Sequence, residues 1–236
     1  CLAVYYLFYR LLLSKETFHR FNRIALLGLL VFSGVVPFVE VTMQEAPQVS
    51  QTFLSLEDMM VPVEEHLDVL DETPKRFPWN ALAFLVYALG ILFFLVRHLW
   101  SLGRMIRLLR TSRKERMEGG ITLFVHKEKV APFSWMKVIA VSEGDLAENE
   151  KAILTHERAH IHNRHSWDLL LAEACVFLQW FNPAAWLLKQ ELQTIHEYEA
   201  DEWVIRNGID AKTYQLLIIK KAVGARLYSI ANSFNH

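Results

Sequence analysis

The sequence has few of the residues on which several classes of protein depend. Two cysteines in 236 residues exclude a small fold held together by disulfide bonds. Charged residues make up only 22% of the chain and hydrophobic residues 53%, which excludes an intrinsically disordered chain. The net charge of −1 gives no positive excess, so we expect no direct binding to nucleic acid. The apolar residues must fill either a large core or membrane-spanning helices, and their distribution along the chain distinguishes the two.

The longest uncharged runs have the length of membrane spans. Residues 79–96 carry no charge over 18 positions, which meets the length of a transmembrane helix. Residues 24–39 form a second uncharged run, and the opening residues 1–13 are also largely apolar. Because residue 1 is not methionine and the start is not basic, we expect a truncated span there rather than a secretory signal. The pattern predicts at least three spans, at about 1–13, 22–41 and 78–98, with buried core helices as the alternative.

The charges between these runs indicate an orientation. Residues 42–77 carry eight acids against two basic residues, whereas residues 97–116 carry seven basic residues against one acid. Lysine and arginine are enriched in cytoplasmic loops, so we expect residues 14–23 and those after 97 to be cytoplasmic and the loop 42–77 to be external. The basic segment 97–116 is predicted to be a juxtamembrane helix resting on anionic lipid rather than a nucleic-acid patch.

After Gly119-Gly120 the pattern changes to that of a separate domain, residues 117–236, following a membrane region at 1–110. Short β-rich runs at 121–125 and 136–141 predict strands, and helices are expected at about 146–165, 167–179, 184–206 and 211–225. Ser142 and Asp145 resemble a capping box before the first of these helices. The apolar stretch 169–188 contains Glu173 and Pro183, so a buried or interfacial helix is expected there in preference to a further span.

The main chemical signal lies in the first of these helices, where residues 156–160 read H-E-R-A-H. Positions i and i+4 share one helix face, so His156 and His160 can bind the same metal ion. Glu157 follows the first ligand and lies where a general base for an activated water is needed. The spacing therefore predicts a catalytic zinc site, which needs one more protein ligand.

Candidates for that ligand lie in the stretch E-Y-E-A-D at 197–201. Glu197 and Asp201 are four residues apart on one face, so one can bind the metal while the other accepts a hydrogen bond from a ligand imidazole. The spacing alone leaves the choice between Glu197 and Glu199 open.

Together with W-F-N-P at 180–183 and P-F-S-W at 132–135, these motifs resemble the BlaR/MecR-type membrane zinc metallopeptidases, bacterial sensor-transducers and antirepressors. The resemblance covers most of the chain. It implies a mainly α membrane protein followed by a cytoplasmic, gluzincin-like α+β peptidase domain with a small β-sheet. It also implies one zinc ion, with Glu197 as the third ligand and Asp201 holding a ligand imidazole. The location would be the bacterial cytoplasmic membrane, with several spans and the site on the cytoplasmic side.

The resemblance implies an endopeptidase that cleaves a transcriptional repressor or itself. The alternatives are a housekeeping membrane peptidase of the Ste24/HtpX type, which shares both zinc motifs, and a transducer that retains the fold without cleaving. Ser134-Trp135-Met136-Lys137 matches the acylation motif S-x-x-K, but no S-D-N or K-T-G accompanies it. Phe133, Ser134 and Trp135 are instead expected to form an edge strand to which a substrate can add.

Two further features stay open at this level. The candidates for a side chain that stabilises the oxyanion are Tyr198, Tyr214 and Arg206. His165 stands shortly after the zinc helix where we would expect an acid, and Asp168 is the nearest substitute.

Overall fold

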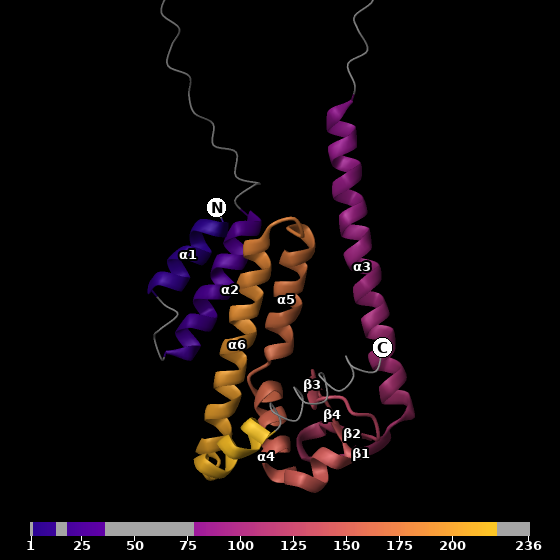
Figure 1. Cartoon of the computed structure of the whole chain (residues 1–236), viewed down its shortest axis with the longest axis vertical. Coiled ribbons are helices and arrows are strands. Elements are labelled where there is room, and N and C mark those ends of the chain that lie inside the picture. The colour runs from indigo at the N-terminus through magenta and orange to yellow at the C-terminus, as the bar shows by residue number, and fades with distance from the viewer. Residues whose placement is uncertain (1, 13–17, 36–77, 221–236) are drawn as a thin grey trace, which may run out of the picture.

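Helices make up most of the part of the chain that the structure, a computed structural model, describes (Figure 1). The described residues are 2–12, 18–35 and 78–220. The predicted external loop 42–77 lies outside them, as do the end of the span at 22–41 and residues 221–225 of the last predicted helix.

Four helices form a bundle with its own apolar core: α1 (Leu2–Leu12), α2 (His19–Val35), α5 (His165–Leu178) and α6 (Pro183–Arg206). On α2, Leu26 and Leu30 are four residues apart on one face and are fully buried. They belong to the same core as Leu188 and Leu192, which have the same spacing on α6. The bundle therefore packs α2 directly against the helix that carries the predicted third metal ligand.

A small sheet and α4 (Glu143–His162) form the second core. The strands are β1 (Arg113–Arg116), β2 (Thr122–His126), β3 (Phe133–Trp135) and β4 (Val138–Ser142), in the order β1-β2-β4-β3. The central strands β2 and β4 are parallel, and both outer pairings are antiparallel. Ile139 and Val141, two residues apart on β4, are fully buried in the core that also contains Ala152 and Ile153 of α4.

Most predicted elements of this domain are confirmed, with shifted ends. The strands at 121–125 and 136–141 correspond to β2 and β4, and the three following helices correspond to α4, α5 and α6. Ser142 is the N-cap of α4, where its hydroxyl accepts a hydrogen bond from the Asp145 amide. Pro183 occupies the first turn of α6, where its missing N–H is not needed. Residues 211–220 are helical, as predicted for the described part of 211–225.

The remaining helix, α3 (Trp79–Thr111), stands beside the bundle and projects beyond it (Figure 1). The prediction of a basic helix to residue 116 is wrong at its end, since the helix stops at Thr111 and residues 113–116 form β1. The hydroxyls of Thr111 and Ser112 donate hydrogen bonds back to the Leu108 carbonyl, as such side chains do where helices end. Beyond them the chain pairs with β2, a tertiary contact that the polar sequence R-K-E-R does not signal.

Among the described helices, α3 alone is long and apolar enough to cross a membrane, and α1 is a shorter apolar helix. The prediction of three spans is thus supported for one helix and stays a prediction for the other two. Two contacts in the first half of α3 show which of its sides meets the bundle. The Tyr87 hydroxyl donates a hydrogen bond to the Leu178 carbonyl at 2.9 Å, and Gly90 lies against the Trp180 indole.

Substituting Gly90 with alanine tests this contact. A Cβ at position 90 would come within 2.2 Å of the Trp180 ring, so the ring or the helix must shift, whereas a Cβ at Gly103 meets nothing within 4 Å. We expect Gly90→Ala to destabilise the protein by about 1–3 kcal/mol, as overpacking does. The matched Gly103→Ala should be neutral or stabilise by up to about 1 kcal/mol through helix propensity. Thermal unfolding in detergent micelles measures both, and equal midpoints would contradict the close contact.

Candidate metal centre

The two histidines of the H-E-x-x-H motif lie on α4, which is interrupted at Asn149. Asn149 interrupts α4 with non-helical dihedral angles, and its side-chain oxygen accepts a hydrogen bond from the Ala152 amide at 3.3 Å. Asn149 therefore caps a fresh helical segment, as its side chain favours. His156 and His160 lie one turn apart on that segment and face α6.

The predicted ligand atoms converge on one point. His156 Nε2 lies 3.1 Å from His160 Nε2 and 3.3 Å from Glu197 Oε2, and His160 Nε2 lies 3.7 Å from Glu197 Oε1. Bonds of 2.0–2.1 Å to a tetrahedral zinc ion place neighbouring ligand atoms about 3.3 Å apart. The three side chains, and the nitrogen and oxygen donors that they offer, thus fit a zinc ion.

The outer nitrogen of His156 is held by polar groups on its far side. Nδ1 lies 2.8 Å from the Tyr214 hydroxyl and 3.2 Å from Asp201 Oδ1, and the Tyr214 hydroxyl donates to the same carboxylate oxygen at 2.7 Å. With a proton on Nδ1, the imidazole keeps the Nε2 lone pair directed at the metal position. Asp201 therefore lies where the sequence places it, beside a ligand imidazole, and Tyr214 is an additional partner.

The second predicted ligand, His160, is held by the buried His165 and Glu199 and, through them, by the partly buried Arg23. His160 Nδ1 lies 2.8 Å from His165 Nδ1, and His165 Nε2 lies 2.9 Å from Glu199 Oε2. Arg23 of α2 reaches the same Glu199 oxygen at 3.0 Å. A proton on His160 Nδ1 and another on His165 Nε2 satisfy both contacts and leave His160 Nε2 free for a metal.

Arg23 is the centre of this polar cluster. Its guanidinium donates hydrogen bonds to Asp168 at 2.6 Å, to Glu199 and to the Asn163 carbonyl at the end of α4. Asp168 is also 3.0 Å from the Nε2 atom of His196, so both carboxylates are shared between Arg23 and a histidine. The pKa values of Asp168 and Glu199 are lowered although burial opposes this, because a histidine and Arg23 hydrogen-bond to each carboxylate.

The two ligand imidazoles differ in their affinity for a proton. Burial disfavours the charged form of His156, but hydrogen bonds with Asp201 and Glu197 outweigh it and raise its pKa to about 9. Burial and the neighbouring His156 charge lower the pKa of His160 to about 3. At neutral pH the His156 imidazole of the metal-free site therefore carries a second proton, which a metal ion must displace.

A cavity of about 350 Å³ opens beside these ligands. Glu157 is buried and lines it together with His156 and Glu197. Pro132, just before the outer strand β3, also lines it, so the predicted edge strand Phe133–Trp135 begins at the cavity rim. Of the candidate oxyanion donors, Tyr214 lines the cavity. Tyr198 instead contacts His19, and Arg206 pairs with Glu202.

The sequence gives only weak signals for the contacts made by Arg23, His165 and Glu199. Glu199 is two residues from Glu197 and thus on another face of α6, which is why it meets His165 rather than the metal position. Arg164 adopts a left-handed conformation, with φ of 58°, between α4 and α5. The resulting sharp turn folds His165 back onto His160, and no local pattern announces such a turn at an arginine.

The fold and the site define a class of protein: a mainly helical one whose candidate donor groups for a single metal ion lie on two packed helices. Comparison with protein families gives the particular family. The profile described as BlaR1 peptidase M56 matches residues 23–235, which include both helices of the site. The chain belongs to this family, which confirms the resemblance to BlaR/MecR-type peptidases and implies peptidase activity on a polypeptide. Among curated proteins, none matches the chain closely enough to count as a relative.

Replacing Arg23 with methionine tests whether its ion pairs with Asp168 and Glu199 stabilise the fold. The substitution leaves Asp168 and Glu199 without their shared cation, so we expect the free energy of unfolding to fall by about 3–5 kcal/mol. Arg20 on the same helix is exposed, and Arg20→Met should change stability by less than about 0.5 kcal/mol. Chemical unfolding of the full chain in detergent compares the two variants, and equal losses would show that Arg23 is not a structural centre.

Zinc affinity should depend on pH through the proton on His156. Below its pKa of about 9, this imidazole must lose a proton to bind, so the association constant should rise about tenfold per pH unit between about pH 6 and 8. The affinity should level off above about pH 9. Competition with a chelator, corrected for the protonation of the chelator itself, measures the slope, and a pH-independent affinity would refute the assignment of the proton.

Proposed function

We propose that the protein is an integral-membrane zinc endopeptidase of the bacterial cytoplasmic membrane that hydrolyses peptide bonds on the cytoplasmic side. The observation that carries the proposal is the convergence of His156, His160 and Glu197, next to a cavity that the buried Glu157 lines. Three protein donors with room for a fourth ligand are the arrangement of catalytic rather than structural zinc. Zinc bound there would polarise the peptide carbonyl and make water a nucleophile near neutral pH.

The residues around the cavity divide the remaining tasks. Glu157 takes the proton of the attacking water and delivers it to the leaving amine. Asp201 and Tyr214 hold His156, while His165 and Glu199 hold His160, so that both imidazoles direct Nε2 at the metal position. Tyr214 lines the cavity and is the candidate donor to the developing oxyanion, a role for which its hydroxyl proton would have to leave Asp201.

An extended substrate fits the outer strand of the sheet. β3 pairs only with β4 among the described strands, so its other edge is available to a peptide. A segment added alongside Phe133, Ser134 and Trp135 would pass the cavity at Pro132, with main-chain hydrogen bonds fixing its register. Such binding selects extended or unfolded segments over helices.

The membrane assignment rests on apolar surfaces whose exposure to water would be unfavourable. No residue of α3 is buried, and its apolar side chains are exposed along the span, including Phe84, Leu89 and Phe93. Exposed apolar side chains also cover α1 and α2, which favours contact with lipid at all three predicted spans. The basic residues from Arg97 onward favour the cytoplasmic side for the metal site.

In a signalling pathway, the substrate would be a cytoplasmic repressor or the protein itself. Family membership favours this sensor-transducer type over a Ste24/HtpX-like housekeeping peptidase. A transducer that retains the fold without cleaving would also bind zinc, and cleavage separates it from the peptidase.

The substitution Glu157→Gln tests the proposed reaction. The variant retains the three donors, so we expect it to bind about one zinc ion per chain while losing turnover by about 100- to 10,000-fold. Glu150, exposed on the same helix, provides the matched control Glu150→Gln, which should cleave like the unaltered protein. Metal analysis and fragment release, from the chain itself and from unfolded β-casein, are measured in vesicles. Undiminished cleavage by Glu157→Gln would refute the mechanism, and bound zinc without any cleavage would favour the non-proteolytic transducer.

A further inference from the structure

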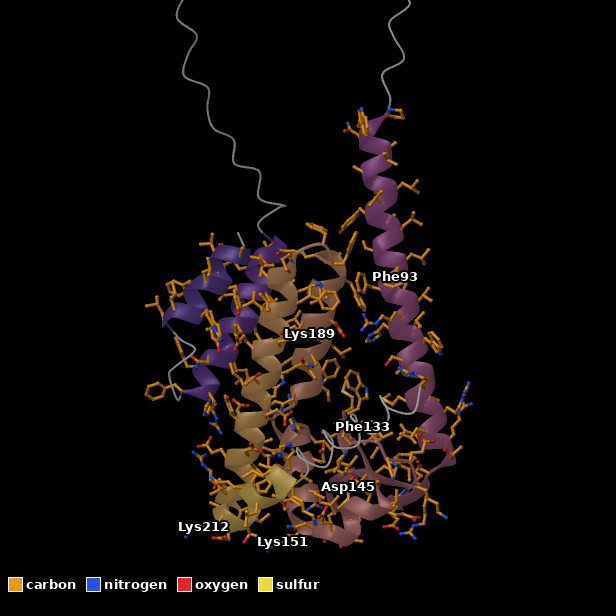
Figure 2. The ribbon with its side chains drawn as sticks, viewed as in Figure 1. Phe93, Phe133, Asp145, Lys151, Lys189 and Lys212 are labelled. Carbon is orange, nitrogen blue, oxygen red and sulfur yellow. The ribbon has the colours of Figure 1, made fainter. Side chains whose placement is uncertain are left out.

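A second cavity, also of about 350 Å³, lies between α3 and the α5–α6 hairpin, away from the metal centre. Three cations line it: Arg97 and Arg104 from α3, and Lys189 from α6. Lys189 lies in the space between the hairpin and α3 (Figure 2). The proposed reaction uses none of these residues.

The charges in this cavity favour an anion. Glu173 is its only acidic lining residue, and Lys189 already pairs with it at 2.7 Å. His98, the remaining titratable lining residue, lies 3.9 Å from the same carboxylate. Arg97 and Arg104 make no hydrogen bond or ion pair within the described part of the chain. Two guanidinium groups thus face the cavity with unused donors, which suit the paired oxygens of a phosphate.

The arginines also share one face of α3. Arg97, Ser101 and Arg104 are four and three residues apart, so they lie above one another on the side that lines the cavity. Arg107 and Arg110, on the same basic segment, do not line it. The structure therefore separates two of these arginines from the rest of the series.

The position of the cavity indicates the source of the phosphate. Arg97 is the first charge after the uncharged run 79–96, so it lies where a span would leave the hydrocarbon and enter the headgroup region. The same cavity is lined by Phe94, Phe177 and Trp186, whose rings suit the glycerol and upper acyl segments of a lipid. A soluble phosphate would use the cations but not this apolar wall.

We propose that this cavity binds the headgroup phosphate of an anionic phospholipid from the cytoplasmic leaflet, held by Arg97 and Arg104. The lipid would fill the space between α3 and the hairpin and fix the distance between them. The inference rests on the proposed membrane function, because it takes α3 as a span. It does not depend on peptide cleavage, so a failure of the peptidase assignment would leave it standing.

The test counts lipids bound to the full chain. Native mass spectrometry of the protein in neutral detergent, titrated with phosphatidylglycerol or phosphatidylcholine, gives a dissociation constant for each lipid. We expect one tight phosphatidylglycerol, weakened at least about tenfold in the double variant Arg97→Gln/Arg104→Gln. The control Arg107→Gln/Arg110→Gln removes the same charge from the same helix outside the cavity and should bind like the unaltered protein.

Each other outcome overturns the proposal. Equal losses in the two double variants would mean diffuse attraction to the basic helix, and equal binding of phosphatidylcholine would mean no selection for an anion. Displacement of the lipid by millimolar inorganic phosphate would mean a soluble ligand. Both arginines are exposed, so we expect the double variant to fold, and Arg104→Glu alone provides a second variant that should also lose the tight lipid.

Discussion

The paired charges of Arg23 are the constraint on which the geometry of the site depends. A guanidinium and two carboxylates sheltered from water are costly unless each finds partners, and here each does. The cluster joins α2 to Asp168 of α5, to Glu199 of α6 and to the end of α4, so four helices meet at one side chain. A shift of α2 would therefore be felt at His160 through two hydrogen-bonded neighbours.

The two halves of the site are held in different ways. His156 is held by Asp201 of α6 and by Tyr214 of the helical segment 211–220. His160 is held through His165 and Glu199, which connect it to Arg23 of α2. The predicted metal position thus lies between the two apolar cores. One core contains α2 and α6, and the other contains α4 and the sheet. Such an arrangement gives α2 a physical route to the metal position.

The sequence predicts those parts of this account that local patterns specify. The i, i+4 spacing of His156 and His160, the cap at Ser142 and the proline at the start of α6 each act within one or two helical turns, and the structure has all three. The sequence does not predict the features that depend on contacts between distant segments. The pairing of β1 with β2 and the contact of Arg23 with Glu199, 176 residues away, have no local signature. The sequence does not predict the break at Asn149 either, because the capping signal at Ser142 already accounts for the start of a helix.

The central claim is that two imidazoles and one carboxylate hold a single zinc ion. X-ray absorption at the zinc edge, on the full chain loaded with one equivalent of metal, reports the ligands directly. The account predicts four nitrogen or oxygen neighbours at about 2.0–2.2 Å, with the multiple scattering of two imidazole rings. A spectrum without imidazole scattering, or with sulfur at about 2.3 Å, would contradict it.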